Sequence, residues 1–175
     1  MAEEIVVQVD SRNRRPRPVP RSRVIAERLT HRGIVVFVLN SKGEVFLQRR
    51  SERKKVYGGC WDASCAGTVG WGESFTECAV RELAEELTLL VTPRQLRRVG
   101  PPYRVTTDRT DEFDQLFTVA SEGQFSLQRA EVSEGRWVPV RSVGRVLSDE
   151  KVTPWFSLGW KLFKKMKKES PARPG

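Results

Sequence analysis

The sequence predicts an α/β protein in which a mixed β-sheet is sandwiched between helices. Three observations lead to this prediction. Segments rich in β-forming residues come first, a loop and an amphipathic helix interrupt them, and further strand patterns precede helical patterns near the C-terminal end. The 175 residues match the length of one domain with a sizeable core, so we expect a single domain over residues 1–175.

The N-terminal region predicts one short strand and a basic segment. Apolar and polar residues alternate from Glu4 to Asp10, which is typical of a strand. Residues 11–23 carry six arginines and three prolines. Because proline has no N–H to donate, this segment cannot be a central strand, and we expect an extended edge segment or a turn. A short helix is expected over residues 24–29.

A hairpin and a long loop are expected next. The run GIVVFVLN at 33–40 is continuous and apolar, as in a buried strand, and residues 44–49 form its partner after the turn at 41–43. Residues 50–55 read as a basic loop. Residues 56–62 combine glycines with aromatic side chains, which suits a loop over a pocket.

The stretch Gly67–Leu89 predicts a glycine-rich loop that runs into an amphipathic helix. One side of this helix is apolar and consists of Phe75, Ala79, Leu83 and Leu87. Glu82, Glu85 and Glu86 share another face because they are three and four residues apart. Three like charges this close destabilise a helix. A multivalent cation would explain them, and Mg²⁺ takes oxygen ligands from carboxylates, substrate phosphates and water.

The remaining chain predicts more strands and two helices. The strands are expected over residues 95–106, 112–121 and 136–140. The helices are expected over residues 141–147 and 155–168. The second helix follows Thr153 and Pro154, which are favourable residues at an N-cap and at the first helical position. Residues 169–175 are expected to form a disordered tail.

The net charge of +9 is concentrated at the two ends of the chain. Residues 1–32 hold eight Lys and Arg against four acids, and residues 151–175 hold seven against one. Such ends could attract nucleic acid. However, the basic segment 11–23 lacks the interleaved aromatic residues that stack on bases. We favour the simpler interpretation that the ends are only solvated.

Several features predict a cytoplasmic protein that is not associated with a membrane. No apolar run reaches the roughly 18 residues that a membrane span needs, and the first residues do not read as a secretion signal. The three cysteines, Cys60, Cys65 and Cys78, form no paired framework, which fits a reducing compartment. A zinc site is not favoured, because a second pair of ligands is missing and His31 is the only histidine.

The loop and helix resemble the signature of the Nudix hydrolases. That signature reads Gly, five residues, Glu, seven residues, then Arg-Glu-aliphatic-any-Glu-Glu-any-Gly-aliphatic. Here it reads Gly67, then Glu73, then RELAEELTL at residues 81–89. Thr88 stands where the family has a glycine that ends the helix at positive φ. This departure concerns the end of the helix and removes no ligand side chain.

The resemblance implies a Nudix-like α/β/α sandwich over residues 4–168 and hydrolysis of a diphosphate linkage with Mg²⁺ or Mn²⁺. Glu82 and Glu86 are the first-choice metal ligands, since side chains at i and i+4 meet over one turn. Glu85 is either a third ligand or the general base. The family also implies the main-chain carbonyl of Ala66 as a ligand. Arg81 resembles the motif arginine that orients a glutamate.

Two glutamates outside the helix are further candidates for the general base. Many Nudix hydrolases bring a loop glutamate to the site before the last strand. Here Glu131 and Glu134 lie in that part of the chain, and either could instead be a solvated acid.

Four residues are candidates for substrate contacts. Arg49, Arg50 and Lys54 could hold phosphates, arginine by bidentate contacts and lysine as a point charge, or they could form a solvated basic loop. Trp71 lies inside the glycine loop and could stack on a base or cover the pocket.

Sequence around the motif also resembles a bacterial subgroup close to isopentenyl-diphosphate isomerase. His31 falls where that isomerase has a metal histidine, and Arg50 and Lys54 fall where it holds the diphosphate. The isomerase needs an acid–base cysteine and, two residues later, a metal histidine. Those positions are Ala66 and Thr68 here.

The predicted function is therefore a nucleotide pyrophosphohydrolase that acts on a nucleoside diphosphate derivative, a small-molecule substrate. An isomerase-like enzyme is one alternative, and an RNA-binding or RNA 5′-end-processing Nudix protein is another. The compound cleaved, the number of metals and the oligomeric state stay open.

Overall fold

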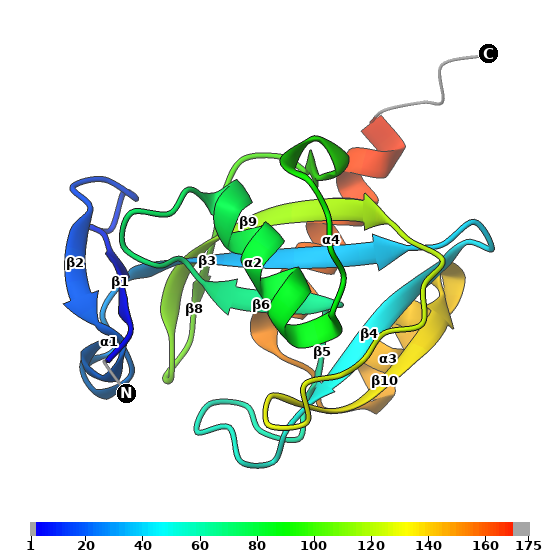
Figure 1. Cartoon of the computed structure of the whole chain (residues 1–175), viewed down its shortest axis with the longest axis horizontal. Coiled ribbons are helices and arrows are strands. Elements are labelled where there is room, and N and C mark those ends of the chain that lie inside the picture. The colour runs from blue at the N-terminus through cyan, green and yellow to red at the C-terminus, as the bar shows by residue number, and fades with distance from the viewer. Residues whose placement is uncertain (1–2, 170–175) are drawn as a thin grey trace.

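A computed structural model describes residues 3–169, and its centre is a mixed sheet built around one long strand (Figure 1). Strand β3 (His31–Leu39) pairs in parallel along its whole length with β9 (Asp111–Ala120). It also pairs antiparallel with β6 (Cys65–Thr68) and, at its end, with β4 (Glu44–Arg50). The combination of parallel and antiparallel neighbours confirms the predicted mixed sheet.

Short strands extend the sheet on both sides of β3. β4 pairs with β5 (Trp61–Asp62) and with β10 (Val132–Pro139). β9 pairs with β7 (Arg97–Arg98) and β8 (Tyr103–Thr106). β9 and its neighbours thus lie along one edge of β3, and β6 and β4 lie along its other edge, with β10 beyond β4.

Helices cover both faces of the sheet, as predicted. Figure 1 shows α2 (Phe75–Leu87) over one face, with α3 (Val143–Asp149) and α4 (Pro154–Glu169) over the other. Alternate residues of β3 point to opposite faces and therefore enter two separate cores. Val36 packs with the apolar side of α2, while Phe37 packs with the aromatic residues of α4. No helix within residues 3–169 is long and apolar enough to cross a membrane.

The N-terminal residues form a hairpin and a helix at one end of the molecule. β1 (Ile5–Gln8) pairs with β2 (Arg17–Pro20) and touches β3 through Gln8. β2 therefore confirms the expected edge segment. Helix α1 (Arg21–Glu27) begins three residues earlier than predicted, because Pro20 supplies its N-cap position and the chain turns directly out of β2.

Some predicted element boundaries were wrong. The expected strand 95–106 is a 3₁₀ turn followed by β7 and β8, because Gly100 has a φ of +66° and two prolines follow it. β5 and β6 were not predicted, since they contain few β-branched residues and exist through pairing with β4 and β3. β10 begins at Val132, so Glu134 lies in a strand and not in a loop.

The prediction for the C-terminal tail is only partly within the described residues. Glu169 is the last residue of α4, so the tail does not begin there. Residues 170–175 lie outside the described residues.

Candidate active site

One part of the site is the N-terminal end of α2 with the loop before it. Ser74 caps the helix: its hydroxyl accepts from the N–H of Glu77, whose carboxylate accepts from the N–H of Ser74. Glu73 accepts a hydrogen bond from the N–H of Gly70 at 2.9 Å, which closes the loop. This local geometry fixes where the following helix begins and therefore the direction in which its glutamates point.

Arg81 connects the acidic residues of the motif. Its Nε donates to Glu73 at 2.6 Å, and its Nη1 donates to Glu82 at 2.8 Å and Glu85 at 3.1 Å. The hydrogen bonds to Arg81 hold the pKa of Glu73 below its ordinary value. This arrangement agrees with the predicted orienting role of the arginine, because it restrains two of the glutamates at once.

Glu82 and Glu86 are carboxylates held in a poorly solvated position. Glu86 is buried, accepts a hydrogen bond from Gln48 Nε2 at 2.9 Å, and has a pKa raised by burial. Burial and the charge of Glu86 raise the pKa of Glu82 to about 7. Both shifts arise because desolvation and a like charge disfavour the ionised form. A nearby cation would reverse both effects.

The backbone of β6 lies directly under these glutamates. A Cβ added to Gly67 would stand 2.5 Å from Glu82 Cγ and closer still to its carboxyl group. The Glu82 side chain therefore occupies the space above Gly67. Only glycine at position 67 leaves this space free, because every other residue has a Cβ. Ala66, the neighbour of Gly67, lines a cavity that Gly67 and Glu82 also line.

The residues suit a hard divalent cation in donor chemistry. Glu82, Glu85 and Glu86 supply carboxylate oxygens, and the Ala66 carbonyl is a further oxygen donor nearby. Within residues 3–169 no three His, Cys, Asp or Glu side chains already form a metal-binding cluster. Arg81 explains this, since it holds Glu82 and Glu85 by hydrogen bonds. Such a cation would need these carboxylates to turn from Arg81, together with oxygen atoms of substrate and water.

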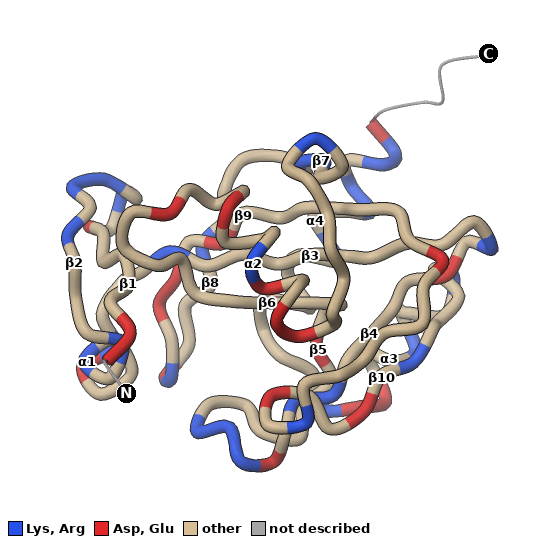
Figure 2. Tube along the Cα trace, viewed as in Figure 1, with Lys and Arg blue, Asp and Glu red and all other residues tan. Residues whose placement is uncertain are grey.

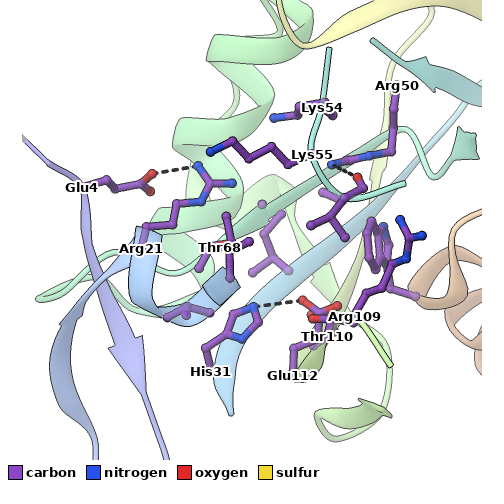
Figure 3. Close-up of a pocket in the computed structure, with 18 of the residues that line it drawn as sticks. Glu4, Arg21, His31, Arg50, Lys54, Lys55, Thr68, Arg109, Thr110 and Glu112 are labelled. Carbon is purple, nitrogen blue, oxygen red and sulfur yellow. Dashed lines mark hydrogen bonds and ion pairs between the residues drawn. The ribbon is translucent and has the colours of Figure 1, made fainter. Parts of the chain in front are cut away.

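Two adjoining cavities, each about 460 Å³, meet at β6. One cavity, which we call the glutamate cavity, is lined by Glu82, Glu85 and Glu86 of α2. Trp71, Gln128 and Glu131 also line it. The basic cavity is lined by six cationic side chains, Arg21, Arg50, Arg53, Lys54, Lys55 and Arg109 (Figure 3). Ala66, Gly67 and Lys54 line both cavities, so a bound molecule could extend from one to the other.

Three of the predicted substrate residues lie at these cavities. Arg50 is held by Asp62 at 3.2 Å and stacks on Trp155, with its guanidinium 5.3 Å from the ring centre. Lys54 forms an ion pair with Glu131. Burial and the charge of Arg50 lower the pKa of Lys54 to about 8. The side chain of Trp71 is half exposed at the edge of the glutamate cavity.

The structure does not bring Arg49 and Glu134 into either cavity. They are register partners on β4 and β10, and their charged groups contact each other at 3.8 Å. Of the two predicted loop glutamates, Glu131 is the one that lines the glutamate cavity.

Sequence reasoning missed several residues of the basic cavity. Arg21 and Arg109 come from α1 and from the turn before β9, far apart in the chain. Glu112 and Asp114 belong to β9 and line the cavity although they are buried. A signal was available for these two, because they are acids at alternate positions of the strand predicted over residues 112–121.

A mixed sheet between helices, with a glutamate-bearing helix beside a basic cavity, defines an enzyme of the diphosphate-hydrolysing class. The chain belongs to the Nudix family: the model of the NUDIX domain matches residues 29–156. It is a Nudix hydrolase that acts on diphosphate-containing substrates, and enzymes of this family generally need divalent metals.

Relatives with Nudix hydrolase and isomerase names match most of the chain. An uncharacterised Nudix hydrolase of Pseudomonas aeruginosa is 34% identical over 137 residues, which cover 77% of this chain and 78% of that protein. An isopentenyl-diphosphate Δ-isomerase of Serratia proteamaculans is 27% identical over 157 residues, 88% of each chain.

Solved structures share the fold. A crystal structure from Deinococcus radiodurans aligns with a TM-score of 0.73 at 22% identity and covers 92% of this chain and 98% of that one. The Nudix domain of Shewanella oneidensis NrtR, solved in complex with ADP ribose, aligns with a TM-score of 0.62 at 15% identity over 84% and 98% of the two chains.

Proposed function

We propose that this protein is a divalent-metal-dependent nucleotide pyrophosphohydrolase that cleaves the diphosphate linkage of a nucleoside diphosphate derivative. One observation supports this most directly. The desolvated pair Glu82 and Glu86 lies beside the basic cavity. Ala66, Gly67 and Lys54 line both the glutamate cavity and the basic cavity. Carboxylates that attract a cation and cations that attract phosphates are thus within the length of one substrate.

In this proposal Glu82, Glu86 and Glu85, with the Ala66 carbonyl, hold Mg²⁺ or Mn²⁺. Such an ion would neutralise charge on the phosphates and lower the pKa of a water molecule. The contribution of the chain is to position these oxygen atoms. Arg81 restrains Glu82 and Glu85 until they bind the ion.

Two glutamates remain candidates for the general base that accepts a proton from the attacking water. Glu85 is more than half exposed and lines the glutamate cavity. Glu131 lines the same cavity and is paired with Lys54. Their pH profiles distinguish them: the residue whose Gln variant loses the acidic limb of kcat is the base. Glu134 remains a weaker candidate, since it lines neither cavity.

The phosphates are proposed to contact Arg50 and Lys54. Arg50 is held in place by Asp62, which leaves its position defined before a substrate arrives. Lys54 lines both cavities and can contact a phosphate placed between them. Trp71 lies where it can cover the bound molecule. Arg49 would contribute only through the field of its charge.

A small molecule is a better candidate substrate than nucleic acid. Figure 2 shows the basic residues of the β1–β2 region far from those of α4, so the two basic ends of the chain do not meet in one patch. The complex of the NrtR Nudix domain with ADP ribose supports a nucleotide-linked compound. We further propose that the protein acts in the cytoplasm.

The test is a panel of nucleoside diphosphates, triphosphates, sugar nucleotides, cap analogues and CoA, each with Mg²⁺ or Mn²⁺, followed by product analysis. Glu82→Gln and Glu86→Gln should each lower kcat/KM by at least about 100-fold. Glu77→Gln is the matched control, because it makes the same change on the same helix and glutamine still serves the capping box. Full activity of Glu82→Gln would disprove the proposed metal site.

Isomerisation is the second candidate, because 27%-identical relatives carry the isomerase name. The local geometry favours hydrolysis. Cys65 is fully buried, and burial, together with the charge of Glu86, raises its thiol pKa well above the ordinary value. Ala66 and Thr68, which line the basic cavity, carry neither a thiol nor an imidazole. Robust conversion of isopentenyl diphosphate to dimethylallyl diphosphate, lost in Cys65→Ala, would favour the isomerase instead.

A further inference from the structure

The basic cavity contains two acids, Glu112 and Asp114, to which the proposed chemistry gives no role. Glu112 and Asp114 lie on β9 and line this cavity with only 9% and 2% of their surfaces exposed. We call this pair the acidic floor. It lies among cationic neighbours, yet the phosphates of a substrate would be repelled from it.

The strand pairing explains why both acids reach the same place. In the parallel register His31 lies beside Glu112 and Gly33 lies beside Asp114. Residues two apart on a strand point to the same face, so both carboxylates stand on one side of the sheet. A Cβ on Gly33 would collide with Asp114 Oδ1, closer than the 3.0 Å that real Cβ atoms keep. Glycine at this position therefore leaves room for the Asp114 carboxylate.

The acidic floor has hydrogen-bonding capacity that the protein does not use. Glu112 Oε1 and Asp114 Oδ2 are buried and have no hydrogen-bond donor among residues 3–169. Burial and the charge of Glu112 raise the pKa of Asp114 well above its ordinary value. Burying a carboxyl group without a partner costs several kcal/mol. Such a loss of stability calls for an explanation, and a ligand that supplies donors is a direct one.

His31 supports donors rather than a metal ion as the ligand. Its Nδ1 lies 3.0 Å from the Leu29 carbonyl oxygen, and its Nε2 lies 3.3 Å from Glu112 Oε2. Burial is the largest single influence on the pKa of His31 and lowers it, but the hydrogen bond to Glu112, the charge of Glu112 and the hydrogen bond to Leu29 together raise the pKa above its ordinary value. Nδ1 faces a carbonyl oxygen and Nε2 faces a carboxylate oxygen, so groups of the protein already occupy both ring nitrogens.

Most of the cationic side chains gather on one side of the cavity, where Arg21 pairs with Glu4 at 2.8 Å. Figure 3 shows Arg21, Arg50, Lys54 and Lys55 on one side, and His31, Glu112 and Thr110 on the other. Arg109 is near Glu112 in this view, and its guanidinium lies 3.9 Å from Asp108 and 6.0 Å from the centre of the Tyr57 ring. A molecule with phosphates at one end and hydrogen-bond donors at the other matches this arrangement.

We propose that Glu112 and Asp114 form a specificity subsite that accepts hydrogen bonds from the nucleoside part of the substrate. The donors would be the vicinal hydroxyls of a ribose or the amino edge of a base. This inference rests on the proposed function for the direction of binding: the diphosphate points to α2, and the nucleoside points to β9.

The test measures binding separately from turnover. ADP, 2′-deoxy-ADP and IDP are titrated by calorimetry into Glu82→Gln protein, whose hydrolysis is switched off, with inorganic pyrophosphate as the donor-free reference. We expect ADP to bind about 10–100-fold more tightly than the analogue that lacks the recognised donor. A loss with 2′-deoxy-ADP assigns the ribose, and a loss with IDP assigns the amino edge.

The same titrations with Asp114→Asn and Glu112→Gln added to Glu82→Gln complete the test. Either substitution should abolish the discrimination between ADP and that analogue and leave pyrophosphate binding unchanged. Asp108→Asn is the matched control, since Asp108 is exposed in the turn before the same strand. Should Asp114→Asn fail to fold, Glu112→Gln, at the less deeply buried of the two positions, decides the question.

Three outcomes would overturn the inference. The first is equal discrimination in Glu82→Gln protein with and without Asp114→Asn or Glu112→Gln, and the second is no discrimination in any of these proteins. The third is a Mn²⁺ or Zn²⁺ site, detected by calorimetry without nucleotide, that Asp114→Asn removes and Glu82→Gln retains. If ADP discrimination depends on Asp114 while the wild-type protein hydrolyses nothing in the panel, the subsite stands and the proposed hydrolysis fails.

Discussion

Substituting Gly67 by alanine should separate the metal site from the fold. The Cβ that Gly67→Ala adds would stand 2.5 Å from Glu82 Cγ, whereas ordinary contacts begin at 3.4 Å. The Glu82 side chain must therefore move by about an ångström. The atoms that must move belong to a flexible side chain and not to the backbone, so the cost in stability is expected at the lower end of the range for overpacking, about 1 kcal/mol.

The effect on function is expected to be much larger. A carboxylate displaced by an ångström no longer binds a cation at the distance that Mg²⁺ demands, about 2.1 Å. Changes that misplace a metal ligand cost about 10–100-fold in metal affinity or activity. We expect the concentration of Mg²⁺ for half-maximal activity to rise by that factor, with a melting temperature within about 4 °C of the wild type.

The assay compares Mg²⁺ titrations of activity and thermal melts for Gly67→Ala and for Gly144→Ala. Gly144 lies in α3, where an added Cβ would meet nothing within 4 Å, so its variant should retain wild-type metal dependence. A Gly67→Ala enzyme with unchanged metal dependence would refute the assignment of Glu82 as a ligand. A large loss of stability would refute the argument that only the Glu82 side chain must move.

Three other predictions concern pH, stability and the end of α2. Lys54 is charged below its pKa of about 8, so kcat/KM should fall above that pH, and Lys54→Arg should move the fall to higher pH. Asp62→Ala removes the fully buried partner of the half-buried Arg50 and should lower the free energy of unfolding by about 3–5 kcal/mol in urea titrations, unlike exposed Asp149→Ala. Thr88 caps α2 with a φ of +56°, so Thr88→Gly should relieve about 1 kcal/mol of strain, partly offset by the lost hydrogen bond to the Ser126 carbonyl, and leave kcat/KM unchanged.

Local pattern was sufficient for the elements that carry their own signal. The apolar spacing predicted α2, and Thr153 with Pro154 marked the start of α4. The departure at Thr88 did not change the end of the helix, since threonine takes the left-handed conformation there and donates its hydroxyl to the Ser126 carbonyl. Elements such as β6, which contains only Cys65–Thr68, could not be predicted because their strand conformation comes from pairing with β3.

The sequence by itself determined the family, the glutamate helix and the chemistry that its carboxylates can perform, because these depend on residue types at short spacings. Only the tertiary structure decided which other residues meet them. It brought Glu131 to the glutamate cavity and left Arg49 and Glu134 outside both cavities. It also placed the acids of β9 in the basic cavity, through a parallel pairing between strands that are about 80 residues apart in the chain. Pairing over such a separation is set by the packing of the whole sheet, which no local pattern encodes.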